Sequence, residues 1–533
     1  MGKSFQRALW WIKRDIRLDD NEALQSACSC AAEVMPVYVV EPMLWTSADA
    51  SAMHLNAVRT ALSALRDKLR ADYDADLLVI RGDLPEAFDK LRAALPFDAI
   101  FAEEETGLAH TFERDKRVRA WARKAGLTFR ELPHAGVIRG LGSREDRKRI
   151  WNARMAYPAI DPPRSIPQAA HALRHARSSE LPGFPECGFS AEAGRTDLAQ
   201  SASNDAGDVP RVDATASGRL PRVDEAPSPG RGLQRVDEPS ARRVLESFLS
   251  TRGEAYNRGI SSPEIARWSG SRLSAHLAWG TISLRRALQR IRDYREEARA
   301  TRKNISLKAL SSVERRLHWH DHFCQRLEDE PQMEFEALNP AFRDLEYSNR
   351  EELFEAWFDG RTGMPMVDAC MRCLRTTGFL NFRMRAMLVS SACHLFDLSW
   401  KRIRYPMAQI MGDYLPGIHI SQLQMQAGVV GINTIRVYSP AKQLTDHDEE
   451  CTFVRKWIPE LAGFPAGEIV AHAKGEREGP LGDYPAPLVD YKVEAKRARS
   501  MLYSLKNRAS RSGASREVLD RHGSRLPASR RRG

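Results

Sequence analysis

The sequence has no long hydrophobic run. Within its 533 residues, no uninterrupted apolar stretch approaches the roughly 20 residues that a helix needs to cross a bilayer. The N-terminal MGKSFQRALWWIKRD also lacks the order of charged, apolar and small residues that defines a secretory signal. These absences argue against a membrane or secreted protein. We expect a soluble, cytoplasmic protein without a membrane partner.

Cysteine is scarce. The chain has eight cysteines, and their irregular spacing fits reduced thiols better than a disulfide framework. Cys370 and Cys373 form a CxxC within a helical apolar pattern, which favours core packing. The alternative is an iron–sulfur ligand set with Cys393 and Cys451, although this spacing matches no standard cluster motif. We therefore predict no metal site.

Acidic residues are in the minority. The chain has 81 Lys and Arg against 70 Asp and Glu, a net charge of +11, which makes its surface attractive to polyanions. Much of the excess lies close to the C-terminus, which ends in RRRG. We predict a basic, disordered tail over 501–533, and the alternative is a segment that contacts nucleic acid.

Strand-like and helix-like segments alternate over residues 1–135. Short apolar segments such as ALWWI, VMPVYVV and FDAIFA are separated by helical patterns, of which the clearest carries apolar residues at three- and four-residue spacings: Met53, Val58, Leu62, Leu65 and Leu69. Alternation of this kind predicts an α/β domain with a doubly wound parallel sheet.

The composition changes after this first domain. Residues 136–240 are predicted to be an interdomain linker, because Pro, Gly, Ser and charged residues dominate from Pro162 to Ser240. This stretch holds a degenerate repeat, PRVDATASGRL, PRVDEAPSPGRGL and QRVDEPS, whose copies are too short to stack a core. From 241 to 500 the periodicity is helical, which predicts an all-α second domain.

Several motifs in the second domain resemble a known family. They are YNRGISSPEIARWSGSRLSAHLAWGTIS, WFDGRTGMPMVDACMRCL and RVYSPAKQLTDHDEECTFVRKWIPEL. Together they resemble the FAD-binding domain of the photolyase/cryptochrome family, and ALWWIKRDIRLDDNEAL resembles the start of that family's antenna domain. The resemblance implies FAD as cofactor. It also implies a second, light-harvesting chromophore of the folate or deazaflavin type in the α/β domain, where Glu103–Gly107 follows a strand.

The resemblance also implies which residues bind FAD. Tyr256 opens the phosphate-binding segment, and a diphosphate would find backbone N–H groups, hydroxyls and a cation at a helix start formed by Ser271, Arg272, Leu273 and Ser274. Arg383 and Arg385 follow the second motif. Arg385 is expected to pair with Asp413 beside the flavin ring, where a cation favours the anionic reduced flavin. The alternative is an ordinary ion pair in a helical bundle.

A lesion pocket is the second expectation from the resemblance. Trp319 matches a tryptophan that stacks on an extruded base in photolyases, although an isolated tryptophan is also typical of a core. Arg316 stands where repair enzymes for cyclobutane dimers carry a glutamate, and it can stabilise negative charge or bind a phosphate. His419 is a candidate proton donor. It belongs to a polar run that would face either the flavin or solvent and includes Ser421, Gln422, Gln424 and Gln426.

The segment between Gly412 and Pro440 departs from the family. Gly417 is expected to face flavin N5, and Ser421 and Leu423 replace the usual Trp-x-Trp pair. An electron relay is therefore expected through other aromatic residues, namely Trp400, Tyr347, Tyr405 and Tyr414. Asn381 and Phe382 replace the two histidines of (6-4) repair enzymes, which argues against histidine-assisted chemistry of that kind.

These residues predict a function with two alternatives. We expect a monomeric, FAD-dependent deoxyribodipyrimidine photo-lyase, which uses blue light to repair pyrimidine dimers in UV-damaged DNA by electron transfer. The first alternative is a cryptochrome-like photoreceptor that binds FAD and signals through a partner without repair. The loss of the Trp-x-Trp pair and of the pocket glutamate supports it. The second is a flavoprotein that binds nucleic acid for another redox task.

Overall fold

A five-stranded parallel sheet forms the centre of the N-terminal region. The computed structural model describes residues 3–133, 135–167, 233–301, 306–477 and 479–523. The sheet has the order β3-β2-β1-β4-β5, with β1 (Phe5–Ile12), β2 (Ala31–Val40), β3 (Leu78–Arg81), β4 (Ala99–Glu103) and β5 (Thr128–Leu132). All neighbouring strands are parallel, which confirms the predicted α/β architecture.

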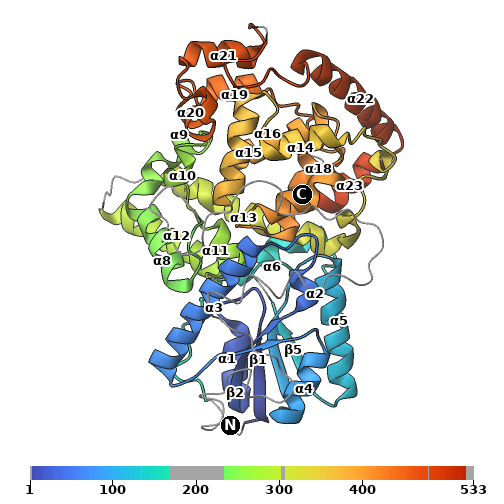
Figure 1. Cartoon of the computed structure of the whole chain (residues 1–533). Helices are drawn as coiled ribbons and strands as arrows, with labels where there is room; N and C mark the ends of the chain where they lie inside the picture. Colours follow the sequence, from blue (N-terminus) through green and yellow to red (C-terminus); the bar gives the residue numbers. More distant parts are fainter. Residues whose placement is uncertain (1–2, 134, 168–232, 302–305, 478, 524–533) are drawn as a thin grey trace.

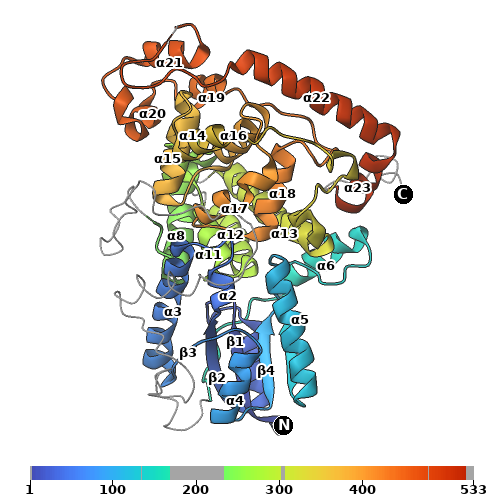
Figure 2. The ribbon, with the colours of Figure 1, turned by 45° about the vertical axis from the view of Figure 1, so that its right-hand side comes forward.

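Helices cover both faces of the sheet because its strands are apolar on both sides. Trp10 and Trp11 are adjacent in β1 and therefore point to opposite faces. Trp10 packs with α1 (Glu22–Cys30) and α3 (Ala52–Tyr73). Trp11 packs with α4 (Glu86–Ala94) and α5 (Ala109–Lys124), and Figure 2 shows α3 and α5 on opposite sides of the sheet.

The helical region lies against the end of the sheet where the short α2 (Pro42–Trp45) is found, as Figure 1 shows. Its helices are predominantly short, and the prediction of a helical second region is confirmed. None of the described helices is both long and apolar enough to cross a membrane. The α-helices are α8 (Glu238–Ser250), α9 (Tyr256–Gly259), α10 (Ala266–Ser269), α11 (Ser274–Ala278), α12 (Leu284–Thr301), α13 (Leu307–Asp329), α14 (Glu351–Asp359), α15 (Pro365–Thr377), α16 (Phe382–His394), α17 (Trp400–Gln409), α18 (Pro416–Gln426), α19 (Pro440–His447), α20 (Thr452–Trp457), α21 (Ala466–Lys474), α22 (Tyr491–Arg511) and α23 (Ala514–His522).

The predicted linker contains a helix. Residues Arg144–Ala156 form α6, whose Trp151 Nε1 donates a hydrogen bond to Asp321 Oδ2 of α13 at 2.8 Å. Its sequence is dominated by charged residues, so a search for apolar periodicity does not detect it. The first two copies of the degenerate repeat lie at 210–233 and, except for Leu233, fall outside the described residues. The third copy, QRVDEPS, is described, and its last three residues begin α8.

Two helices occupy much of the predicted basic tail. The tail was predicted to be disordered from residue 501, but α22 continues to Arg511 and α23 ends at His522. Leu502, Ala509 and Val518 are buried, so these helices carry a narrow apolar stripe among many charged residues. The prediction of disorder is therefore wrong for 501–522, because overall charge concealed this stripe. Residues 524–533 lie outside the described residues.

The CxxC lies in the core of the helical region. Cys370 and Cys373 are fully buried on α15, and Cys370 Sγ lies 3.7 Å from Met366 Sδ. No three His, Cys, Asp or Glu side chains gather as a metal site in the part of the chain that the structure describes. The structure therefore gives these two thiols a packing role.

Buried ion pairs join the two regions at the loop after β1. Arg285 of α12 binds Asp20 through Nε and Nη2, and only 2% of the Asp20 side chain is exposed. Arg17 Nη2 donates to Glu103 Oε1 at 2.6 Å, and its Nη1 donates to the carbonyl of Gly280 at 3.2 Å. Burial raises the pKa of Asp20, but the hydrogen bonds from Arg285 and Ser283 lower it by a larger amount. The pKa therefore lies below its usual value.

The junction gives a stability prediction. Arg285→Met should lower the free energy of unfolding by about 3 kcal/mol or more, because it leaves the Asp20 carboxylate buried without its partner. Arg290→Met on the same helix is the matched control, since its pair with Glu246 is exposed to solvent and should contribute less than about 1 kcal/mol. Urea unfolding measures both variants, and equal losses would contradict the assignment.

Candidate active site

A cavity of about 250 Å³, here called the inner cavity, lies within the helical region. Its walls come from the segment before α11, the start of α16, the end of α17 and one side of α18. Much of the wall is apolar, formed by residues that include Phe379, Val389, Met407, Met411 and Leu423. A mainly apolar cavity with a few charged groups is the usual form of a cofactor site.

One charged group on this wall is a two-pronged ion pair. Arg385 donates from Nη1 to Asp413 Oδ1 at 2.8 Å and from Nη2 to Oδ2 at 3.0 Å, and its Nε donates to the Leu380 carbonyl at 2.7 Å. Burial raises the pKa of Asp413, but Arg385 and the Ser274 hydroxyl lower it more, so the pKa lies below its usual value. The predicted Arg385–Asp413 pair is therefore present and ionised on the wall of the cavity.

The second charged group is Arg272, which has no ion-pair partner among the described residues. Its guanidinium carbon lies 3.6 Å from the centre of the Phe379 ring. Burial, with a contribution from Arg267, lowers the pKa of Arg272 to about 9. Ser271 and Ser274 line the same cavity. A half-buried cation beside two hydroxyls, with no carboxylate paired to it, fits the phosphates of FAD.

Arg383 does not lie on the wall. Its Nε donates to Ser261 Oγ at 3.0 Å. Two residues along an α-helix correspond to about 200° of rotation, so Arg383 and Arg385 point to nearly opposite sides of α16. The structure therefore places Arg383 away from the inner cavity, and its role in binding the cofactor stays a prediction.

Helix α18 presents only one side to the inner cavity. Ile418, His419 and Gln422 line it, whereas Gly417 lies against α13, where an added Cβ would be 2.5 Å from the Cys324 Cα. Glycine thus allows the two helices to pack closely, and the prediction that it faces the flavin is wrong. No sequence motif identified Ile418 as a cavity residue, because the sequence does not show which side of α18 faces the cavity.

The other polar residues of α18 are also divided between its sides. Gln424 Nε2 donates to the Met333 and Glu336 carbonyls at 2.8 and 2.7 Å, and Ser421 Oγ donates to the Phe323 carbonyl at 3.3 Å. These two residues therefore stabilise contacts within the helical region. Gln422 and Gln426 remain as amides on the cavity wall.

His419 is a neutral, buried histidine. Its Nε2 lies 2.6 Å from the Arg404 carbonyl, which can only accept, so Nε2 carries the hydrogen. Burial lowers the pKa of His419 to about 4. At neutral pH its one ring hydrogen is therefore held by the Arg404 carbonyl, which argues against the predicted role as proton donor.

A larger cavity of about 680 Å³, here called the outer cavity, adjoins the inner one. The two share wall residues, among them Tyr256, Arg316 and Gln422. Arg316 interacts with the Tyr256 hydroxyl. Trp319 and Phe382 line the outer cavity with 50% and 48% of their surface exposed, so aromatic faces are open to solvent there. Leu273 also lines it.

Three of the residues expected to form an electron relay lie away from both cavities. Trp400 is buried in the core, Tyr347 packs against that core, and the Tyr405 hydroxyl donates to Glu334 Oε1 at 2.9 Å. Tyr414 does line the inner cavity. Its ring stacks on His54 with 5.4 Å between ring centres. Of the four residues expected to form the relay, Tyr414 is therefore the one that lies on the cavity wall.

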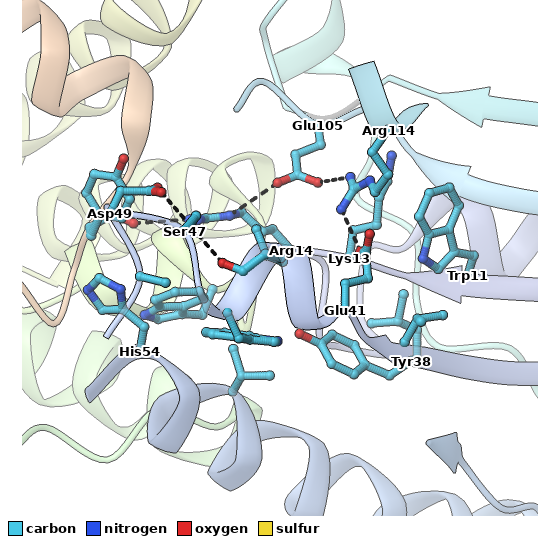
Figure 3. A pocket seen from close by; sticks show the side chains of 18 residues that line it. Trp11, Lys13, Arg14, Tyr38, Glu41, Ser47, Asp49, His54, Glu105 and Arg114 are labelled. Atoms are coloured by element: carbon cyan, nitrogen blue, oxygen red, sulfur yellow. Dashed lines mark hydrogen bonds and ion pairs between the residues drawn. The ribbon is translucent and has the colours of Figure 1, made fainter. Parts of the chain in front are cut away.

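A third pocket lies at the carboxyl end of the sheet, where the strand order reverses between β1 and β4. Figure 3 shows that Arg114 lies between Glu41 and Glu105, with Arg14 on the far side of Glu105. Arg114 contacts Glu41 Oε1 at 2.9 Å and Glu105 Oε2 at 2.6 Å. Burial raises the pKa of Glu41 to about 7, while Arg114 and Arg14 overcome burial and hold the pKa of Glu105 at about 2.

This pocket is the place where an α/β fold usually binds a ligand. Its volume is about 40 Å³, which is room for water alone. With its side chains in this arrangement it does not fit a folate or a deazaflavin. A second chromophore in the α/β domain stays a prediction, and electron transfer in the helical region does not require one.

Comparison with protein families connects these cavities to a known architecture. Residues 8–144 match the family described as DNA photolyase, and residues 313–504 match the family described as the FAD binding domain of DNA photolyase. The chain belongs to the photolyase/cryptochrome family. The inner cavity lies largely within the second match, so FAD is the cofactor that the family assignment gives to it.

Relatives with different names are similarly distant from this chain. It is 28% identical to a deoxyribodipyrimidine photo-lyase of Thermus thermophilus, covering 88% of this chain and 96% of the relative. It is 27% identical to a cryptochrome DASH of Natronomonas pharaonis, covering 91% and 98%. Family membership therefore leaves repair and light sensing as alternatives.

Solved structures support the fold. A bacterial class III photolyase from Agrobacterium tumefaciens matches with a TM-score of 0.74 at 21% identity, covering 95% of this chain and 99% of the other. A photolyase from Sulfolobus tokodaii, described with two FAD molecules, matches with a TM-score of 0.71 at 22% identity, covering 94% and 100%. At these identities the likeness concerns the fold alone.

The ion pair on the wall gives a binding prediction. Arg385→Ala should weaken FAD binding about tenfold or more, because it removes a cation from the wall and leaves Asp413 buried and unpaired. Arg383→Ala is the matched control, since Arg383 contacts Ser261 instead. Titration of the apoprotein with FAD measures both dissociation constants. Unchanged binding by Arg385→Ala would show that the pair is not part of the flavin site.

His419 gives a pH prediction. Its pKa of about 4 in the folded protein lies below the ordinary value of 6.5. The unfolded chain therefore binds more protons between pH 6.5 and 4, and this contribution to stability is lost as the pH falls through that window. In His419→Gln the fall should be smaller by about 1.4 kcal/mol for each pKa unit of the shift. Urea unfolding at several pH values measures it, and an unchanged pH dependence would contradict the assignment.

Proposed function

We propose that the protein is a light-driven photolyase that repairs pyrimidine dimers in UV-damaged DNA. The observation that carries this proposal is the arrangement of the two cavities. The inner cavity adjoins a larger one in which Trp319 presents a half-exposed aromatic face. An enzyme that acts on a base must take it out of the DNA stack, and an aromatic wall replaces part of the lost stacking.

The residues of the inner cavity would hold FAD in defined ways. Arg272, with Ser271 and Ser274, would bind the diphosphate, because a half-buried cation and two hydroxyls suit its negative charges. Arg385, fixed by Asp413, would stabilise negative charge on the ring system. When bound, a reduced flavin supplies an electron on excitation by blue light and accepts it again after the dimer splits.

Arg316 would act on the lesion side. It lines both cavities and interacts with Tyr256, so its cation lies where the two cavities meet. A cation in this place can stabilise the negative charge that a dimer acquires with an extra electron. Repair enzymes that carry a glutamate at this position lack this positive charge.

A cryptochrome-like photoreceptor is the second candidate. The observation that favours it is that no tryptophan is among the described residues on the wall of the inner cavity, where Leu423 stands, whereas Trp400 lies in the core. Reduction of the flavin would then depend on Tyr414 or on an external donor. A signalling partner belongs to this alternative only, whereas a monomeric state and a cytoplasmic location are expected of both.

A repair assay tests the proposal. FAD-loaded, reduced protein should remove dimers from single- or double-stranded DNA under blue light and leave them intact in the dark. Trp319→Ala should weaken binding of dimer-containing DNA about tenfold, because base–aromatic stacking contributes roughly 1–3 kcal/mol. Trp268→Ala is the matched control, since Trp268 is 52% exposed and lines neither cavity.

Two results would separate the candidates. Unchanged dimers in both kinds of DNA, together with light-induced changes in flavin absorption, would contradict repair and favour the photoreceptor. Equal DNA binding by Trp319→Ala and Trp268→Ala would show that the outer cavity is not the lesion pocket.

A further inference from the structure

Arg326 of α13 is a buried arginine with unused donors. It lines the outer cavity with only 5% of its surface exposed. Its Nη2 donates to the His522 carbonyl at 3.3 Å and lies 3.3 Å from His322 Nε2. Its Nε and Nη1 have no hydrogen-bond partner among the described residues. Buried donors without partners are rare, so these two groups call for a ligand.

The cavity wall around Arg326 contains no compensating negative charge. The wall of the outer cavity carries three arginines, Arg316, Arg326 and Arg436, and none of its described residues is Asp or Glu. The Phe323 ring centre lies 5.6 Å from the guanidinium carbon. Burial and the nearby Arg147 lower the pKa of Arg326 to about 10. A buried cation in such a wall is costly until an anion binds beside it.

A structural role accounts for only part of this side chain. The contact with the His522 carbonyl places a cation at the C-terminal end of α23, which favours that helix. Arg521 and His522 of α23 also contact Glu330 at 2.8 and 3.3 Å, so α23 is held by other residues as well. Docking of α23 thus uses Nη2 and leaves Nε and Nη1 for another group.

We propose that Arg326 forms a phosphate-binding subsite in the outer cavity, which takes a phosphodiester of the DNA strand that carries the lesion. The planar guanidinium offers parallel N–H donors that match phosphate oxygens. Trp319 lies seven residues earlier on α13, two turns or roughly 10 Å along the axis, and lines the same cavity. One strand can therefore place a base against Trp319 and a phosphate at Arg326. The DNA assignment rests on the proposed function, whereas the phosphate site does not.

Inorganic phosphate tests the site independently of DNA. The FAD-loaded full chain is melted in phosphate and in chloride at equal ionic strength. Phosphate should raise the unfolding temperature of the parent and of Arg315→Gln, an exposed arginine on the same helix. It should have little effect on Arg326→Gln. Equal stabilisation of Arg326→Gln and the parent by phosphate would overturn the subsite.

A short DNA tests the source of the phosphate. The probe is a five-nucleotide single strand with a central thymine dimer, in which each phosphate is replaced in turn by a neutral methylphosphonate. One replacement should weaken binding by the parent and by Arg315→Gln about tenfold. The same replacement should have little further effect in Arg326→Gln, because the methylphosphonate and the substitution remove the same interaction. If every replacement weakened binding by the same factor in the parent and in Arg326→Gln, the DNA assignment would be overturned.

Other outcomes distinguish this proposal from the proposed function. Loss of FAD from Arg326→Gln alone would assign the phosphate to the flavin and overturn the DNA assignment. Phosphate stabilisation that depends on Arg326, in a protein that neither binds nor repairs dimers, would support the anion subsite and contradict the repair function.

Discussion

The constraint on which this structure depends is that a buried arginine needs an anion. Removing a guanidinium from water costs several kcal/mol, and a carboxylate at hydrogen-bond distance offsets that cost. The chain meets this requirement repeatedly. Arg285 binds Asp20, Arg17 binds Glu103 and Arg385 binds Asp413, each through short contacts between elements far apart in the sequence. These pairs fix the junction of the two regions and one end of the inner cavity.

The same rule identifies where ligands belong. Arg272 is half-buried and Arg326 is buried, neither has an ion pair among the described residues, and each lines a cavity. In contrast, Arg114 in the pocket at the end of the sheet is surrounded by Glu41, Glu105 and Asp115. That pocket has its charges balanced and little free space. The two cavities of the helical region retain unbalanced positive charge, which fits a dinucleotide cofactor and a nucleic-acid substrate.

The sequence anticipated the fold better than the site. Apolar segments that alternate with amphipathic helices predicted the parallel sheet. The prediction was possible because the hydrophobic periodicity of a strand or helix can be seen in a short stretch of sequence. The Arg385–Asp413 pair was anticipated from motifs on both sides of it. Gly417 and Arg383 were assigned to the flavin site from position in the chain, yet α18 turns Gly417 toward α13 and α16 turns Arg383 toward Ser261. His419 does line the inner cavity, but its Nε2 is bound to the Arg404 carbonyl.

The amino-acid sequence by itself determined the two architectures, because periodicity is a property of neighbouring residues. The resemblance of its motifs to a known family indicated the family and the cofactor. Only the tertiary structure decided which side of each helix faces a cavity. That choice depends on packing between distant segments: the close contact of α18 with α13 at Gly417 exposes Ile418 and Gln422 to the inner cavity. Tertiary structure also decided which arginines find a carboxylate, and it left Arg272 and Arg326 without one among the described residues.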